Sequence, residues 1–195
     1  ATAKPSSDIK AIGPINPQSW AFLEGGKEYT KDLDRATERL ISSPPELPLE
    51  FTLTTTVLYL QQANEIREQW QEFGEYAEQE CQKSDEVENK DVCPNMKIKT
   101  NIKVTNFPDV QDYQLLLMGQ EIDVDPDQYL LWHSEQPSNF TKYRNTRIDS
   151  ILENARQTLE YNERLALYQE FQQFLLEDPP AIFLQHLVSY DVRRR

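Results

Sequence analysis

The sequence predicts an α/β fold, because a strand, a helix and a second strand follow one another near the middle of the chain. Residues 50–57 alternate aromatic or apolar side chains with threonines, the period-two pattern of a half-buried strand. Apolar residues recur at helical spacing over 60–73, and residues 97–104 alternate again. Strand, crossover helix and strand form a parallel pair with a right-handed connection. At 195 residues, one domain over 1–195 is the expected organisation.

Prolines limit regular structure in the first quarter of the chain. Residues 1–48 contain six prolines, each of which fixes φ and removes a backbone donor. We expect residues 1–30 to form an extended segment that leads into the domain. One helix is predicted over 32–40, with Asp32 as its N-cap. Gly74 is expected to end the next helix as a left-handed C-cap.

The second half of the chain predicts two strands and two helices. Residues 113–118 form a short apolar run that is typical of a buried strand. After a polar segment, apolar residues at helical spacing predict helices over 148–159 and 165–175. A final strand is predicted over 181–190.

The two cysteines lie in the acidic, polar segment 76–95, which is predicted to be a surface insertion. Cys81 and Cys93 are twelve positions apart, and in an oxidising compartment such a pair can form a disulfide. Closing a loop of this length stabilises a protein by about 3 kcal/mol in the chain-entropy model. Two unrelated thiols are the alternative, and two cysteines alone do not decide between them. Their position in a core-poor loop favours the disulfide.

Charge and motifs argue against several classes of function. With 33 acidic and 20 basic residues the net charge is −13, so a nucleic-acid partner is not expected. No apolar run approaches the length of a membrane span, and no glycine-rich phosphate-binding motif occurs. His133 and His186 lack the surroundings of a hydrolytic triad or a zinc site. We therefore expect a protein that is not an enzyme and that needs no cofactor or metal.

Four acidic residues alternate in the polar segment after the short strand: Glu121, Asp123, Asp125 and Asp127. Like charges this close repel each other unless a cation lies nearby, so a cationic partner is one interpretation. A solvated acidic loop before a helix is the other. A calcium loop is not expected, because Gln128 stands where that motif needs glycine.

Two aromatic residues follow the acidic loop. Tyr129 and Trp132 either line a ligand cleft or pack beneath it, and aromatic side chains contribute large burial in both cases. The sequence leaves both interpretations open.

Four runs in the second half of the chain carry a family resemblance. Residues 125–134 (DPDQYLLWHS), 149–156 (DSILENAR), 167–172 (LYQEFQ) and 177–184 (EDPPAIFL) resemble the C-terminal lobe of family 5 extracellular solute-binding proteins. These proteins are the peptide-, dipeptide- and nickel-type receptors of ABC importers.

The resemblance implies a two-lobed clamshell of the periplasmic-binding-protein type (type II), of which this chain holds one lobe with a mixed sheet flanked by helices. Its partners would be a peptide or small solute, the N-terminal lobe of the same receptor and an ABC permease. The implied location is the periplasm or the outer face of the membrane, with a lipid anchor on the full-length protein.

The resemblance also implies ligand-binding residues. In oligopeptide receptors of this family, the acid of a G-W-x-x-D motif meets the ammonium of the ligand. Gly119 places Asp123 at that position, but Gln120 replaces the tryptophan, and Asp125 is a competing match because the loop is one residue shorter. The replacement leaves an adhesion or regulatory protein as the alternative function. The predicted ligand-binding set is Gln120, Asp123, Asp125, Tyr129 and Trp132.

Overall fold

The computed structural model describes residues 9–85, 87–110, 112–121 and 125–187. The chain divides into two compact units. Unit 1 combines residues 1–29 with 121–195, and unit 2 comprises residues 30–120. The assignment of residues 1–195 to a single lobe stays a prediction, and each unit is described by itself.

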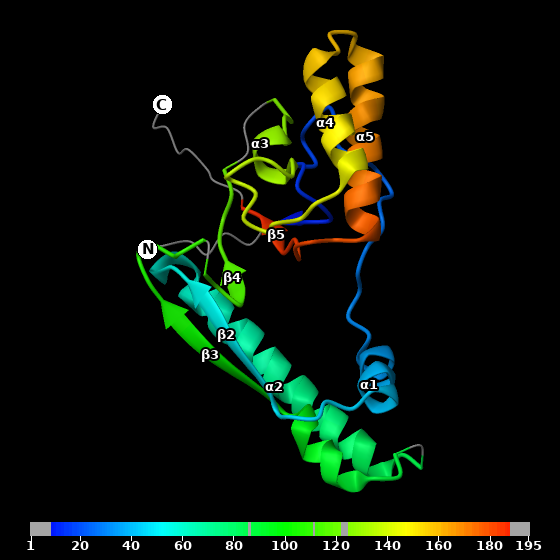
Figure 1. Ribbon diagram of the computed structural model, residues 1–195, viewed down its shortest axis with the longest axis vertical. Coiled ribbons are helices and arrows are strands. Elements are labelled where there is room, and N and C mark those ends of the chain that lie inside the picture. The colour runs from blue at the N-terminus through cyan, green and yellow to red at the C-terminus, as the bar shows by residue number, and fades with distance from the viewer. Residues whose placement is uncertain (1–8, 86, 111, 122–124, 188–195) are drawn as a thin grey trace, which may run out of the picture. The chain divides into compact units, whose positions relative to one another are not determined.

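Unit 2 contains the predicted strand–helix–strand arrangement (Figure 1). Its sheet has the order β3-β2-β4, from β2 (Leu49–Thr55), β3 (Ile98–Val104) and β4 (Leu115–Leu117). Both pairings are parallel, and Leu49 lies opposite Ile98. The carboxyl ends of all three strands therefore lie at one edge of the sheet.

The helices of unit 2 begin and end partly as the sequence predicts. Helix α1 (Leu33–Ser42) has the predicted N-cap, because the Asp32 carboxylate accepts a hydrogen bond from the Arg35 amide at 3.0 Å. A 3₁₀ turn η1 (Val57–Tyr59) leads into α2 (Leu60–Lys83), and η2 (Lys90–Met96) precedes β3.

Helix α2 passes through Gly74, so the predicted C-cap is wrong. Gly74 is buried inside the helix, and a Cβ atom there would stand 2.6 Å from the backbone nitrogen of Ile98. The glycine is needed because the helix approaches the start of β3 closely, which local sequence signals do not reveal.

Segment 76–95 also differs from the predicted polar surface insertion. Its first residues continue α2 to Lys83, and both cysteines are fully buried and joined by a disulfide with a Cα–Cα distance of 5.6 Å. The buried residues of this segment form a hydrophobic cluster, here called the disulfide core: Ala77, Cys81, Val87, Cys93 and Met96.

Unit 1 is built around a helical hairpin of α4 (Thr146–Gln157) and α5 (Tyr161–Glu177), which lie side by side in Figure 1. A short helix α3 (Tyr129–Trp132) precedes them. The two-stranded antiparallel sheet pairs β1 (Ile9–Lys10) with β5 (Gln185–His186). Of the strand predicted over 181–190, Gln185 and His186 form β5, and residues 188–190 lie outside the described part.

The segment predicted as an extended lead-in contributes to the core of unit 1. Ala11, Ile15 and Ala21 are buried, and Ile15 and Ala21 belong to the main hydrophobic cluster of this unit. Gln172 of α5 holds this segment, because its buried side chain accepts from the Leu23 amide and donates to the Ala21 carbonyl at 2.8 Å.

Candidate functional site

The predicted ligand-binding residues fall in both units of the structure. Gln120 ends unit 2 and its side chain is exposed, whereas Asp125, Tyr129 and Trp132 belong to unit 1. Asp123 lies outside the described residues. The structure therefore describes these residues on the two units separately.

In unit 1, the Asp125 carboxylate is paired with an arginine from α5. Nη2 of Arg164 donates to both carboxylate oxygens, at 2.8 and 3.1 Å. Arg164 also donates to the Ala155 carbonyl and to the Tyr168 hydroxyl, each at 3.1 Å. Burial alone would lower the pKa of Arg164, but the bonds to Asp125 and Tyr168 prevail and raise it. The chain itself therefore supplies a cation to the Asp125 carboxylate.

Asp127 has a second arginine partner, on α4. Nε of Arg156 donates to Oδ2 of Asp127 at 2.7 Å, and the other carboxylate oxygen accepts from the Tyr129 amide at 3.0 Å. The guanidinium of Arg156 also lies 4.2 Å from the centre of the Tyr129 ring, within cation–π range. Tyr129 is half-buried between this guanidinium and the ring of His133.

Trp132 packs in the core of unit 1, with 5% of its surface exposed. Its indole nitrogen donates to Oε1 of the buried Gln128 at 3.2 Å, and its ring contacts Phe183. The sequence leaves open whether Trp132 lines a ligand cleft or packs beneath it, and in this structure its side chain is packed.

Each ring nitrogen of His133 has a hydrogen-bond partner within unit 1. Nδ1 accepts from the Glu135 amide at 3.2 Å, which assigns the ring proton to Nε2, 3.1 Å from the Glu153 carboxylate. Both ring nitrogens are therefore occupied. Among the residues with described placement, no group of His, Cys, Asp or Glu side chains is arranged to hold a metal ion.

In unit 2, the carboxyl edge of the sheet presents apolar side chains to solvent. Open parallel sheets bind ligands beyond the carboxyl ends of their strands. Leu58 after β2 is 82% exposed and Phe107 after β3 is 90% exposed. We call this surface the carboxyl-edge surface and define it by the exposed residues that follow the three strands: Val57, Leu58, Phe107, Met118 and Gln120.

Two polar features accompany the carboxyl-edge surface. The hydroxyl of Thr56 is buried without a hydrogen-bond partner among the described residues. Gly119 lies against Tyr59, whose hydroxyl occupies the space where a Cβ atom would be. The sequence alone does not reveal Leu58 and Phe107 as part of this surface, because only the parallel register brings the segments after β2 and β3 to one edge.

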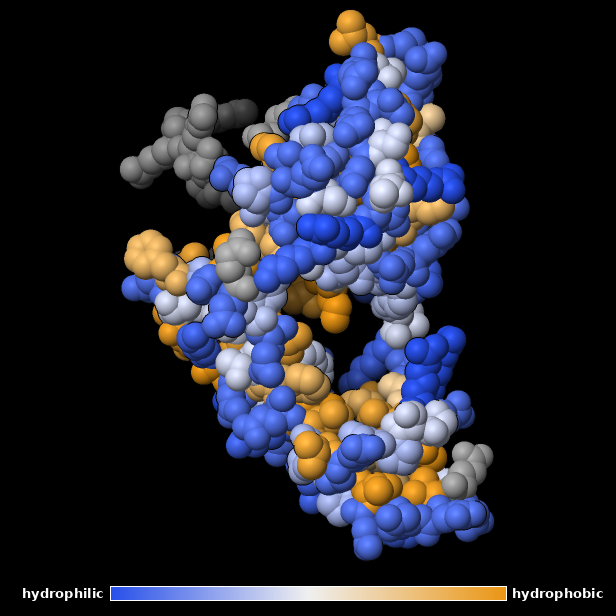
Figure 2. All heavy atoms as spheres, in the orientation of Figure 1, coloured by the Kyte–Doolittle hydropathy of each residue, from blue (hydrophilic) through white to orange (hydrophobic). Residues whose placement is uncertain are grey.

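On the face shown in Figure 2, hydropathy differs between the two units. In Figure 2, hydrophilic side chains cover most of α4 and α5, whereas apolar side chains are more exposed over unit 2. No described helix has the length and apolar character that crossing a membrane requires.

Sequence comparison gives one distant relative. No family model matches the chain. The oligopeptide-binding protein AppA of Bacillus subtilis is 28% identical over 78 residues, which are 38% of this chain and 14% of that protein.

Solved structures with a similar fold include solute-binding proteins. DppA of Helicobacter pylori, an ABC transporter-associated periplasmic binding protein in complex with the peptide STSA, matches with a TM-score of 0.69 and 22% identity. NikZ of Campylobacter jejuni in complex with Ni(L-His) also matches with a TM-score of 0.69 and 22% identity. These matches cover 91% and 92% of this chain but only 33% and 37% of the two receptors.

The chain therefore has the α/β fold of one lobe of a periplasmic binding protein, as the sequence predicts. The predicted resemblance is confirmed at the level of the fold, because the structural neighbours are solute-binding proteins of the DppA, AppA and NikZ type. The chain spans about a third of the length of these solved relatives.

Proposed function

We propose that this chain is the C-terminal lobe of the substrate-binding component of an ABC transporter. The component captures peptides or similar small solutes outside the cytoplasm and delivers them to a membrane permease. The observation that carries the proposal is the fold likeness over about nine-tenths of the chain to receptors solved with a peptide or a nickel–histidine complex.

The proposed chemistry is binding without reaction. A carboxylate pairs with the ammonium of a peptide, and hydrogen bonds to an extended backbone give affinity with little sequence preference. Closure of this lobe and the N-terminal lobe around the ligand excludes water and presents a closed form to the permease. In this proposal the receptor is not an enzyme, and a lipid anchor holds it at the outer face of the membrane.

Within the proposed site, Asp123 is the better candidate for the ammonium-binding carboxylate. Both oxygens of Asp125 already accept hydrogen bonds from Arg164, so a ligand ammonium would have to compete with a bound guanidinium. Gln120 and Tyr129 are proposed as further ligand contacts, whereas Trp132 packs in the core of unit 1.

Calorimetry on the full-length receptor that contains this chain tests the proposal. Short peptides are titrated into the unaltered receptor and into the Asp123→Asn, Asp125→Asn and Asp85→Asn variants, with the exposed Asp85 as a matched control. We expect Asp123→Asn to weaken binding about tenfold or more, since it removes a charge-assisted bond. The control should leave the affinity unchanged.

Two results would count against the site or the function. Unchanged affinity after both Asp123→Asn and Asp125→Asn would remove the acidic loop from the binding site. Absence of binding for every peptide and small solute tested, in a folded receptor, would favour the adhesion or regulatory alternative.

A further inference from the structure

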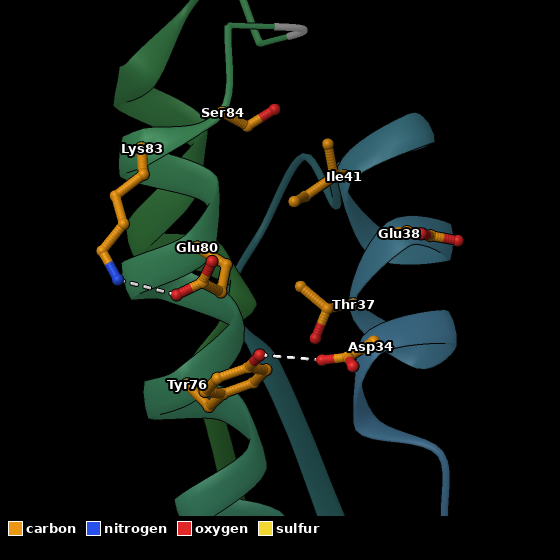
Figure 3. A pocket seen from close by; sticks show the side chains of 8 residues that line it. All are labelled: Asp34, Thr37, Glu38, Ile41, Tyr76, Glu80, Lys83 and Ser84. Atoms are coloured by element: carbon orange, nitrogen blue, oxygen red, sulfur yellow. Dashed lines mark hydrogen bonds and ion pairs between the residues drawn. The ribbon is translucent and has the colours of Figure 1, made fainter.

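Unit 2 also has a groove between α1 and α2, lined by none of the residues of the carboxyl-edge surface. Its volume is about 310 Å³, within the range of small-molecule sites. Figure 3 shows Asp34 and Thr37 on α1 facing Tyr76 on α2, with Ile41 further along the groove. Glu80 lines the α2 side.

Three side chains that line this groove carry oxygen atoms with unused hydrogen-bonding capacity: Asp34, Thr37 and Tyr76. The Tyr76 hydroxyl donates to Oδ1 of Asp34 at 2.9 Å, which leaves the tyrosine oxygen able to accept. This bond is the leading cause of the raised pKa of Tyr76. Asp34 forms no ion pair with any cation in the described part of the chain. Thr37, one helical turn from Asp34, therefore lies beside an unneutralised carboxylate.

Thr37 supplies an independent observation that points to a ligand. The residue is more than nine-tenths buried, with 4% of its surface exposed, and its Oγ1 has no hydrogen-bond partner among the described residues. Threonine inside a helix commonly bonds the carbonyl four residues earlier, and this one does not. In Figure 3 its side chain points from α1 into the groove, toward the Asp34–Tyr76 pair.

We propose that the α1–α2 groove binds the primary ammonium group of a short aliphatic amine. An ammonium has three N–H donors and no acceptor, which matches the carboxylate of Asp34 and the hydroxyl oxygens of Thr37 and Tyr76. The positive charge of the amine forms an ion pair with the Asp34 carboxylate, and the alkyl chain lies along Ile41. The site is separate from the peptide-binding role, because it rests on other residues.

Nuclear magnetic resonance titration of the chain tests this site with n-butylammonium chloride as the probe and butan-1-ol as its neutral counterpart. We expect butylammonium to cause saturable shifts of the Thr37 and Tyr76 amide signals, and butanol to cause none at the same concentrations. Equal shifts with both probes, or shifts that never saturate, would overturn the proposal.

Variants separate the ammonium contacts from general charge effects. Thr37→Val keeps the side-chain volume but removes the hydroxyl, and should weaken binding about three- to tenfold. Asp34→Asn, at an exposed position, should abolish binding and provides the test if the valine variant does not fold. Glu68→Gln, on α2 but outside the groove, should bind like the unaltered chain. If Glu68→Gln weakens binding as much as Asp34→Asn, the effect is nonspecific and the assignment fails.

Discussion

At the scale of single residues, Gly74 links the helix of unit 2 to its sheet. Replacing it with alanine would gain about 1 kcal/mol of helix propensity. The added Cβ would stand 2.6 Å from the Ile98 nitrogen and 3.0 Å from the Met96 oxygen, both backbone atoms that cannot move aside easily. The steric cost of the Cβ atom therefore outweighs the gain in helix propensity, and the substitution lowers the free energy of unfolding.

We predict that Gly74→Ala destabilises the chain by about 1–3 kcal/mol. The free energy of unfolding in urea measures the effect. Gly13→Ala is the matched control, because a Cβ at Gly13 would meet only Leu176 at an ordinary 3.7 Å. A Gly74→Ala variant as stable as the unaltered chain would show that α2 and β3 are not packed this closely.

His186 on β5 makes stability depend on pH. Burial lowers the pKa of His186 below its ordinary value of 6.5, and Nε2 has no partner in the described part of the chain. The unfolded chain thus binds the proton more readily than the folded one. The stabilisation is present above pH 6.5 and is lost as the pH falls toward the lower folded-state pKa.

We predict that the unaltered chain loses more stability between about pH 7 and about pH 5 than a His186→Gln variant does. Urea unfolding at both pH values, monitored by circular dichroism, gives the comparison. Identical losses in the two proteins would mean that His186 does not contribute to the pH dependence.

At the scale of elements, the Cys81–Cys93 disulfide joins the last turn of α2 to η2 within the disulfide core. The chain-entropy model gives about 3 kcal/mol for a closed loop of this size. We predict a lower melting temperature in the presence of a phosphine reductant. A Cys81→Ala/Cys93→Ala variant is the control and should not respond to reductant. Alkylation of two thiols in the unreduced chain would contradict the prediction.

The arginine pairs of unit 1 connect α4 and α5 to the acidic loop. The Arg164–Asp125 pair is partly exposed, with 23% and 55% of the side chains accessible, so solvent screening reduces its contribution. A double-mutant cycle with Arg164→Gln and Asp125→Asn should give a coupling of about 0.5–1 kcal/mol. The more exposed Arg147–Glu170 pair should give less. Zero coupling for Arg164 and Asp125 would mean that the pair does not hold the loop.

At the scale of the whole molecule, periodicity predicts the parallel strands and most helices. The period-two runs correspond to β2 and β3, and Asp32 caps α1 as predicted. The spacing patterns and the cap involve residues that lie close together in the sequence, so the sequence alone shows them.

The features that the sequence does not predict depend on distant partners. Gly74 lies within α2, where the helix approaches the start of β3 too closely for a Cβ atom. The arginines that pair with Asp125 and Asp127 lie 39 and 29 positions further along the chain. Local charge spacing left a cationic partner and a solvated loop as alternatives, and only the fold shows that two arginines pair with these carboxylates.

Native mass spectrometry of the full-length receptor tests the central claim most directly. The receptor is purified under gentle conditions, and its mass is compared before and after denaturation. A solute-binding protein should carry ligands of peptide or small-solute mass that are released on denaturation. A folded receptor that shows only its own mass, and that takes up none of a supplied peptide mixture, would contradict the claim.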